Sequence, residues 1–317
     1  MKIGLQIGPE FRRYADKANR LVADAQAAEA KGFASVWVPQ IPGEFDALTA
    51  ITLMGNATAR LELGTAVLPI QTRHPVAMAQ EILSNQIVCE GRFVPGLGPS
   101  HHWIIDDMLG LPYEKPAALV RDYLEVLNGA LAGPGKVEVE NERFRVNSPI
   151  DVTDRPTEVL LAALGPVMLR IAGEQASGTI LWLADERSIA EHVAPKICGA
   201  ADKAGRPAPR IVAGVPVALC APSEVDEARA RASQLLSHAE YSPNYERLLE
   251  TGDAKGVGDL LIAGDEAAVR ARLQRFADAG TTDLAVRVLP LGSNRDERIA
   301  SKERTIDFLS SLCPSFP

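Results

Sequence analysis

The order of apolar segments along this chain is the feature that most constrains its fold. Short segments rich in Val, Ile and Leu alternate with longer segments whose apolar residues recur at helical spacing. The strand-like segments are 2–7, 33–38, 61–68, 92–96, 158–163, 178–183, 210–220, 259–263 and 283–289. Such alternation predicts an α/β fold with a parallel sheet covered by helices, and these segments supply the eight strands that close such a sheet into a (β/α)8 TIM barrel.

Helices are expected between these strands. Their ranges are 14–31, 46–59, 76–89, 118–131, 166–176, 189–204, 223–238 and 266–279. Gly32 and Gly280 follow two of them, where a left-handed glycine commonly ends a helix. The polar stretch 133–156, with a hairpin favoured over 137–144, interrupts the rhythm, so we expect one domain over 1–317 with an insertion at about 117–157.

An open doubly wound sheet is the alternative architecture. It would normally carry a glycine-rich dinucleotide-binding fingerprint directly after the first strand. Here only Gly8-Pro9-Glu10 follows, which is a poor match. The barrel is therefore the favoured fold.

Composition excludes several functional classes. The net charge is −8 and no basic run offsets it, which opposes nucleic-acid binding. No stretch of about 18 apolar residues is present to span a membrane. The first residues lack the apolar core and cleavage site of a signal peptide, so a cytoplasmic protein is expected. No metal site is expected, because the His and Cys residues lack ligand spacing, and no serine stands in a nucleophile elbow.

Barrel enzymes build their sites from loops at the carboxyl ends of the strands. These ends fall at 6–9, 39–46, 66–74, 96–102, 163–166, 182–185, 219–223 and 288–293. Two of the loops, 98–101 and 162–166, consist largely of small residues and Pro, which lets backbone N–H groups face a ligand. The second loop runs directly into a helix, whose first turn is a natural phosphate site. The alternative is that these glycines and prolines only end the strands.

Histidines near these ends are candidate proton-transfer groups. His101 follows the fourth strand, and imidazole is the one side chain whose unperturbed pKa lies near neutrality, although a solvent-facing histidine is an equally open interpretation. His74 precedes Pro75 and is expected to cap a helix, while the adjacent Arg73 could meet an anionic group. The acidic pair 106–107 is interpreted as the start of a short helix rather than a catalytic dyad.

Four motifs together resemble those of the bacterial luciferase-like flavin and deazaflavin oxidoreductases, in particular the branch that uses coenzyme F420. The motifs are Ala28-x-x-x-Gly32-Phe33-x-Ser35-Val36-Trp37, Leu63-Gly64-Thr65-Ala66-Val67-Leu68-Pro69 with His74-Pro75 downstream, Gly91-Arg92-Phe93 and Gly96-Leu97-Gly98. The resemblance covers nearly the whole chain. It implies an α/β barrel with an insertion, a homodimer, and a cofactor ring at the strand ends. It also implies a non-proline cis peptide, which the motif places at Ala66–Val67.

The resemblance also implies a set of cofactor-binding residues. They are Gln40, Ala66, Val67, Gly98, Pro99, Ser100, His101, Ala163, Leu164, Gly165, Trp182 and Ala184. The F420-dependent sugar-phosphate dehydrogenases of the family have an Asp-His pair after the second strand and a Glu in the fourth strand loop. This chain has Pro39-Gln40 and His101 there, so that activity is not implied. His101 becomes the candidate catalytic proton donor or binding group.

The function implied is hydride transfer between F420 and a small organic molecule such as an enone or imine. The cofactor carries the electrons, and the protein positions the substrate and handles a proton. The alternatives are an FMN-dependent monooxygenase, which shields a reactive flavin from water, and a non-catalytic cofactor-binding protein. Residues 39–45, 102–103 and 241–255 are expected to form the substrate walls.

Overall fold

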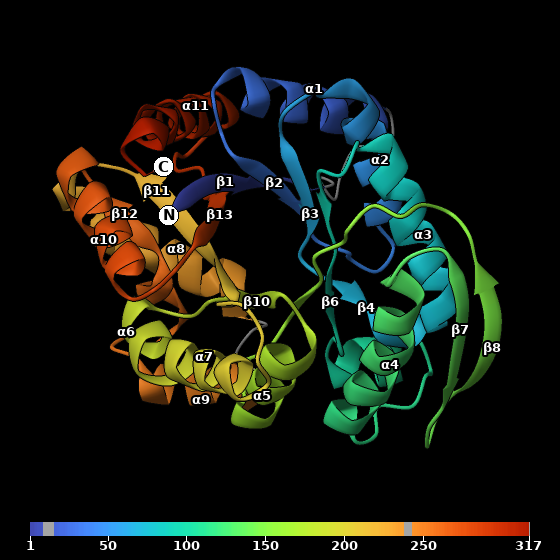
Figure 1. The fold of residues 1–317 in the computed structure, drawn as a ribbon. Coiled ribbons are helices and arrows are strands. Elements are labelled where there is room, and N and C mark those ends of the chain that lie inside the picture. The colour runs from blue at the N-terminus through green and yellow to red at the C-terminus, as the bar shows by residue number, and fades with distance from the viewer. Residues whose placement is uncertain (9–15, 238–242, 317) are drawn as a thin grey trace.

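A curled parallel sheet forms the centre of the protein in this computed structural model, which describes residues 1–8, 16–237 and 243–316. Figure 1 shows helices packed around its outside. The strands are β1 (Lys2–Gln6), β2 (Ser35–Val38), β3 (Glu62–Thr65), β4 (Leu68–Pro69), β5 (Phe93–Val94), β6 (Gly96–Gly98), β9 (Leu160–Leu161), β10 (Gly178–Trp182), β11 (Arg210–Leu219) and β13 (Asp283–Val288).

The pairing of these strands closes the sheet on itself. The hydrogen-bonded order is β4-β6-β9-β10-β11-β13-β1-β2-β3-β5. Only residues 66–67 separate β3 from β4, and only Pro95 separates β5 from β6. β3 and β4 are therefore two parts of the third strand, and β5 and β6 are two parts of the fourth. The two ends of the hydrogen-bonded order, β4 and β5, thus belong to neighbouring strands, which closes the ring. Eight parallel strands form the ring, and the predicted (β/α)8 barrel is confirmed.

The expected strand at 259–263 is not part of this ring, so that prediction is wrong. Val257–Leu260 forms a 3₁₀ turn, and the short strand β12 (Ile262–Gly264) pairs with the end of β11. β11 extends beyond its pairing with β10, which ends at Gly214, so its last residues offer an unpaired edge that β12 covers. The sequence pattern contained one strand segment more than the ring uses.

Eleven helices are found in the described parts of the chain. They are α1 (Lys17–Ala30), α2 (Ala47–Ala57), α3 (Pro75–Val88), α4 (Pro116–Leu131), α5 (Pro166–Gln175), α6 (Glu186–Ser188), α7 (Ala194–Lys203), α8 (Val225–Leu236), α9 (Pro243–Thr251), α10 (Glu266–Asp278) and α11 (Arg295–Leu312). The expected helix start at Tyr14 and the expected end at His238 lie outside the described residues. None of these helices is both long and apolar enough to cross a membrane.

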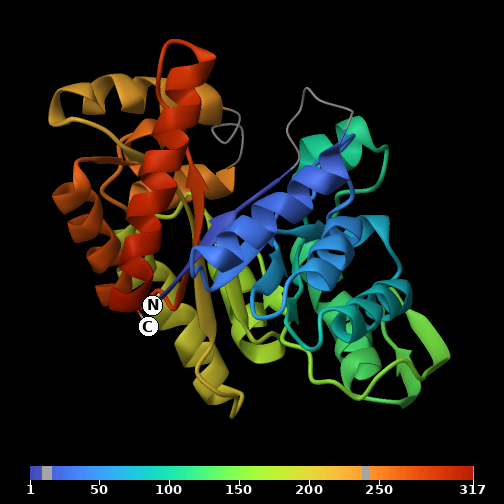
Figure 2. The ribbon, with the colours of Figure 1, turned by 90° about the horizontal axis from the view of Figure 1, so that it is seen from above.

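Besides the one-turn α6, two helices were missed by the sequence pattern. α9 lies inside the stretch 241–255, which is polar apart from a few apolar side chains. α11 buries Ser301 and Thr305 on its inner face, so its apolar spacing is incomplete. Figure 2 shows α11 beside α1, and Ser310 Oγ donates to the carbonyl of Lys31 at 2.6 Å. The last helix thus ties the end of the barrel to its beginning.

Local signals in the sequence were more reliable. Gly32 and Gly280 have φ of 79° and 95°, so both predicted glycine caps are confirmed. The hairpin is also confirmed: β7 (Gly135–Glu140) pairs antiparallel with β8 (Arg145–Ile150). It packs on α4, and α4 itself packs between α3 and α5 as the barrel helices do. The π-helical turn Trp103–Met108 contains the acidic pair that was expected to begin a short helix.

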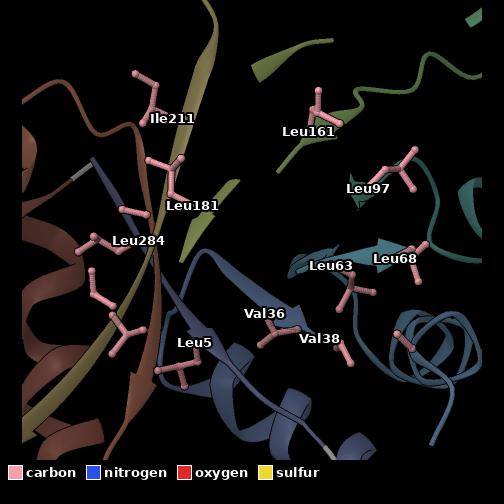
Figure 3. Close-up of a cluster of buried hydrophobic side chains, with 14 of the residues drawn as sticks. Leu5, Val36, Val38, Leu63, Leu68, Leu97, Leu161, Leu181, Ile211 and Leu284 are labelled. Carbon is pink, nitrogen blue, oxygen red and sulfur yellow. The ribbon is translucent and has the colours of Figure 1, made fainter. Parts of the chain in front are cut away.

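Apolar residues form two layers on the two faces of the sheet. The outer layer lies between strands and helices, and Figure 3 shows part of it, including Leu5, Val36 and Leu284. The inner layer fills the barrel with Trp37, Val94, Leu160, Ile180, Val212 and Ala285. Side chains alternate between the two faces along a strand. A strand residue next to one in the outer layer therefore faces the barrel interior.

Candidate active site

The carboxyl ends of the strands open above the inner layer of the barrel. Ala66 and Val67, at the break between β3 and β4, pack on this layer and are partly exposed. The peptide bond between them is cis, as the resemblance implied. The inner layer is thus the floor of the candidate site.

The third, fourth and fifth strands are packed very closely at this end. Thr65 Oγ1 accepts a hydrogen bond from the backbone N–H of Gly96 and donates to its carbonyl, both at 2.9 Å. A Cβ on Gly98 would lie 3.0 Å from Val67 Cγ2 and 2.9 Å from Ala162 Cβ. The expected residues Ala66, Val67 and Gly98 are therefore brought together.

The loop after β6 is held from both sides. Gln71 Nε2 donates to the carbonyl of Pro99 at 2.6 Å, and the Tyr113 hydroxyl donates to the carbonyl of Ser100 at 3.1 Å. Ser100 has a positive φ of 56°, which non-glycine residues seldom adopt. The carbonyls of this loop are bound internally, so the backbone that continues to His101 is fixed in place.

His101 lies in an aromatic cluster. Its ring stacks on Trp103 with centroids 4.2 Å apart and an angle of 10°, and the ring of Tyr245 on α9 lies 5.9 Å away. Burial raises the pKa of Tyr245, so its hydroxyl stays protonated. His102 is exposed and meets Trp103 only edge-on. Of the two adjacent histidines, His101 is the one held by its neighbours.

The loop after β9 is fixed by a histidine from the next unit. Ala163 is buried, and the carbonyl of Leu164 lies 2.8 Å from His192 Nε2. Lys196 Nζ lies 3.1 Å from the other ring nitrogen of His192. A carbonyl can only accept and an ammonium can only donate, so this arrangement fits a neutral His192 that is protonated on Nε2.

Gly165 caps α5, and a cation lies in front of it. A Cβ on Gly165 would be 3.2 Å from a guanidinium nitrogen of Arg247 on α9. The first backbone N–H groups of α5, apart from that of Pro166, and this guanidinium all favour an anion here. Arg247 lies within the expected wall segment, although its role was not predicted. Tyr241, at the start of that segment, lies outside the described residues.

Asp185 anchors α9 to the barrel. Its carboxylate is buried and accepts from the backbone N–H of Ser188 at 2.8 Å, of Asp253 at 2.7 Å and of Ala254 at 3.2 Å. A Cβ on Gly252 would lie 2.3 Å from this carboxylate. The turn after α9 therefore docks directly on the loop after β10.

Trp182 and Ala184 lie at the carboxyl end of β10, on one side of the site. Trp182 is on the same face of β10 as Ile180, and its ring covers Gly214, where a Cβ would lie 2.8 Å from Cε3. Ala184 is buried, so its side chain does not reach solvent.

Polar residues after the second and third strands bind other groups of the protein. Gln40 Oε1 accepts from the backbone N–H of Ala47 at 2.8 Å, which caps α2. Arg73 pairs with Asp46 at 2.8 Å and with Glu81 at 2.9 Å, so its anionic partners are internal. His74 Nδ1 accepts from the N–H of Val76 at 3.3 Å, and its predicted capping role is confirmed.

Two interior-facing residues were not singled out by sequence reasoning, although Gln6 falls in the predicted strand end 6–9. Gln6 ends β1, and Arg287 lies near the end of β13. Strand alternation gives the signal, since Arg287 is the single cation in the otherwise apolar segment 284–289.

A second cluster of charges closes the opposite end of the barrel. Arg210 bonds Glu62 and Asp283 at 2.8 Å and Glu158 at 3.0 Å. These residues line a cavity of about 510 Å³. Sites in barrel enzymes lie at the other end, so we assign this cluster to stability.

Comparison with known proteins gives the family. The sequence model described as luciferase-like monooxygenase matches residues 1–283. The chain belongs to the luciferase-like monooxygenase family. This luciferase-like protein is 25% identical to 5,10-methylenetetrahydromethanopterin reductase of Methanopyrus kandleri, over 94% of this chain and 95% of that protein. It is 32% identical to an F420-dependent hydroxymycolic acid dehydrogenase of Mycobacterium tuberculosis, over 55% of this chain and 51% of the relative.

A solved structure of another protein shares the fold. An F420-dependent secondary alcohol dehydrogenase, solved with an F420-acetone adduct, superposes with a TM-score of 0.78 at 17% identity. The superposition covers 100% of this luciferase-like chain and 99% of that protein. The barrel is therefore shared along its full length.

Proposed function

We propose that this luciferase-like protein is an F420-dependent oxidoreductase that transfers a hydride between the deazaflavin and a small organic substrate such as an enone or imine. The observation that carries the proposal is the likeness over 94% of the chain to a methylenetetrahydromethanopterin reductase. The similarity to an F420-dependent dehydrogenase, over about half of the chain, points to the same cofactor.

The site offers suitable surfaces for each part of F420. Ala66, Val67 and Gly98 present a small-residue surface for the ring, and His101 and Trp182 would border the bound ring. Gln71 Oε1 is buried and has no hydrogen-bond partner among the described residues, so it could accept from a ring N–H. The phosphate would lie at Gly165 between the start of α5 and Arg247.

The remaining expected contacts are proposed to act mainly through backbone. Ala163 and Ala184 are buried, and Pro99 and Ser100 have their carbonyls bound internally. Leu164 is held by His192, and Gln40 supports the second strand end by capping α2. These residues would fix the shape of the cradle.

Bound F420 would supply the hydride, and the protein would hold the substrate and manage the proton. His101 is the proposed proton donor because imidazole can both give and take a proton and its ring is fixed by stacking on Trp103. The aromatic cluster with Tyr245 would also exclude water from one side of the substrate.

An FMN-dependent monooxygenase is the second candidate, favoured by the description of the matching family. A ring surface and a phosphate site suit FMN as well. A carrier without turnover would use the same cradle. The homodimer, the cytoplasmic location and the single domain with an insertion stay predictions.

The test is the oxidation of reduced F420, followed by absorbance, with and without oxygen and with a panel of cyclic enones and imines. The proposal expects substrate-dependent oxidation without oxygen. His101→Asn should slow it at least about tenfold, whereas Arg270→Met, on the exposed face of α10, should leave it unchanged. Turnover that requires oxygen and FMN would favour monooxygenation, and binding without turnover would favour the carrier.

A further inference from the structure

Gln6 and Arg287 lie side by side in the mouth of the barrel. β1 and β13 are parallel neighbours with Leu5 opposite Val286, so the next residues along both strands are also opposite each other. Leu5 and Val286 face the outer core, and Ala285 belongs to the inner layer. Alternation therefore directs Gln6 and Arg287 toward the barrel interior, one layer above Ala285.

Within the described residues, neither Gln6 Oε1 nor the Arg287 guanidinium has a side-chain partner. Gln6 Oε1 is buried and has no hydrogen-bond partner within the ranges that the structure describes. Arg287 reaches solvent, yet desolvation by the surrounding protein lowers the pKa of its guanidinium. In those same ranges no carboxylate pairs with Arg287 and no side-chain hydrogen bond reaches it. A buried acceptor without a partner, such as Gln6 Oε1, costs free energy unless a ligand satisfies it, and the guanidinium of Arg287 beside it is open to a ligand.

The other end of the barrel shows the contrast. Arg210 faces the interior on the same face of β11 as Val212, and three carboxylates hold it. An interior arginine in this protein is thus fully paired where it serves stability. Among the described residues, Arg287 has no such partners at the end of the barrel where ligands bind.

We infer that Gln6 and Arg287 form a substrate-binding pair that recognises a small organic acid, with a carboxylate on Arg287 and a neighbouring hydroxyl or amino group donating to Gln6 Oε1. This inference rests on the proposed function. A guanidinium binds a carboxylate through two parallel hydrogen bonds, and an amide oxygen accepts from an O–H or N–H. The pair would therefore bind two adjacent groups of one molecule, a carboxylate and a hydroxyl or amino group.

The position of the pair suits a substrate rather than the cofactor. In the closed ring, β1 and β13 lie across from the β5/β6 strand and β9, which carry Gly98 and the Gly165 loop. The proposed cofactor cradle occupies that far side. A substrate held by Arg287 would therefore lie opposite the cradle, with its reactive carbon directed toward the ring.

Mandelate, phenylacetate and methyl mandelate test the pair as probes. Phenylacetate lacks the hydroxyl of mandelate, and the ester lacks its charge. Calorimetric titration of the protein, with and without F420, should give an affinity order of mandelate, phenylacetate, then ester. Loss of a charged hydrogen bond corresponds to about tenfold or more in affinity. An ester that binds as tightly as mandelate, or mandelate that does not bind, overturns the inference.

Variants assign each contact. Arg287→Met should remove the preference for mandelate over its ester, and Arg287→Lys should restore part of it. Gln6→Leu should remove the preference for mandelate over phenylacetate. Arg270→Met, on the exposed face of α10, is the matched control and should change nothing. Unchanged preferences in the Arg287 and Gln6 variants would overturn the inference.

Titration with F420 distinguishes the acid-binding inference from the proposed F420-dependent function. F420 affinity should be unchanged in Arg287→Met, because the residue is assigned to the substrate. If F420 binding falls as much as mandelate binding, Arg287 belongs to the cofactor and the inference is wrong. If wild-type protein binds mandelate selectively but binds no F420, the proposed function fails while the acid site stands.

Discussion

The indole of Trp37 lies directly against the backbone of Gly64: a Cβ on Gly64 would be 2.2 Å from ring carbons Cε3 and Cζ3. Trp37 is fully buried, and its Nε1 donates to Ser35 Oγ at 2.9 Å. The largest side chain of the barrel interior thus depends on a glycine in the neighbouring strand.

Gly64→Ala should lower the free energy of unfolding by about 1–3 kcal/mol, because the added methyl has no space. Chemical denaturation measures this. Gly199→Ala is the matched control, since nothing lies within 4 Å of a Cβ on this α7 residue and alanine favours a helix. Equal effects of the two substitutions would contradict the packing account.

Asp185→Asn should weaken F420 binding roughly tenfold, because the amide replaces an acceptor for the turn that positions Arg247. Asp185 is a positioning residue here. If it acts through Arg247, its effect should be less than additive with that of Arg247→Ala in fluorescence titrations. Asp265→Asn, which alters the exposed cap of α10, should leave binding unchanged. Fully additive losses would indicate a general structural role for Asp185.

Arg210→Met should cost about 3 kcal/mol of stability, because Asp283 would remain buried without its cation. Desolvation disfavours the charge of Arg210, but hydrogen bonds to Glu62 and Asp283 outweigh it and raise the pKa of Arg210. Adding Asp283→Asn should recover part of the loss in thermal or chemical unfolding. A double variant less stable than Arg210→Met would contradict this explanation.

Asp46 gives a pH-dependent prediction. Burial opposes its charge, but hydrogen bonds from the Thr49 N–H and Arg73 outweigh burial and lower the pKa of Asp46 below 3.8. The charge therefore stabilises the folded state above that value, and the contribution is lost as pH falls through the lower folded pKa.

Asp46→Asn keeps a capping oxygen but removes the charge. The difference in unfolding free energy between wild type and this variant should be constant near neutral pH and should shrink below about pH 4. Denaturant titrations at several pH values measure it. A difference that does not change down to about pH 3 would argue against the ionised Asp46–Arg73 pair.

The barrel was predictable because its strands and helices carry clear local periods, and Gly32 and Gly280 mark helix ends. α11 was missed because Ser301 and Thr305 occupy its buried face, which hides the helical period. The extra strand at 259–263 was expected because Leu260, Leu261 and Ile262 look like a core strand. Whether such a segment enters the ring depends on which edge of β11 is unpaired, and that is a tertiary property.

The candidate site was predictable where small residues follow a strand. The loops at Gly98 and Gly165 could be placed in this way. Arg247 and Tyr245 were expected only as part of the wall segment 241–255. Their individual roles were not predictable, because α9 reaches the site through the Asp185 anchor, which joins segments far apart in the sequence. Gln6 and Arg287 become visible as a pair only from the register of β1 with β13.

The dissociation constants of the protein for F420 and for FMN, measured by fluorescence quenching in one buffer, test the central claim most directly. The proposed function predicts selective binding of F420, weakened by Arg247→Ala. Selective binding of FMN, or binding of neither cofactor, would contradict it.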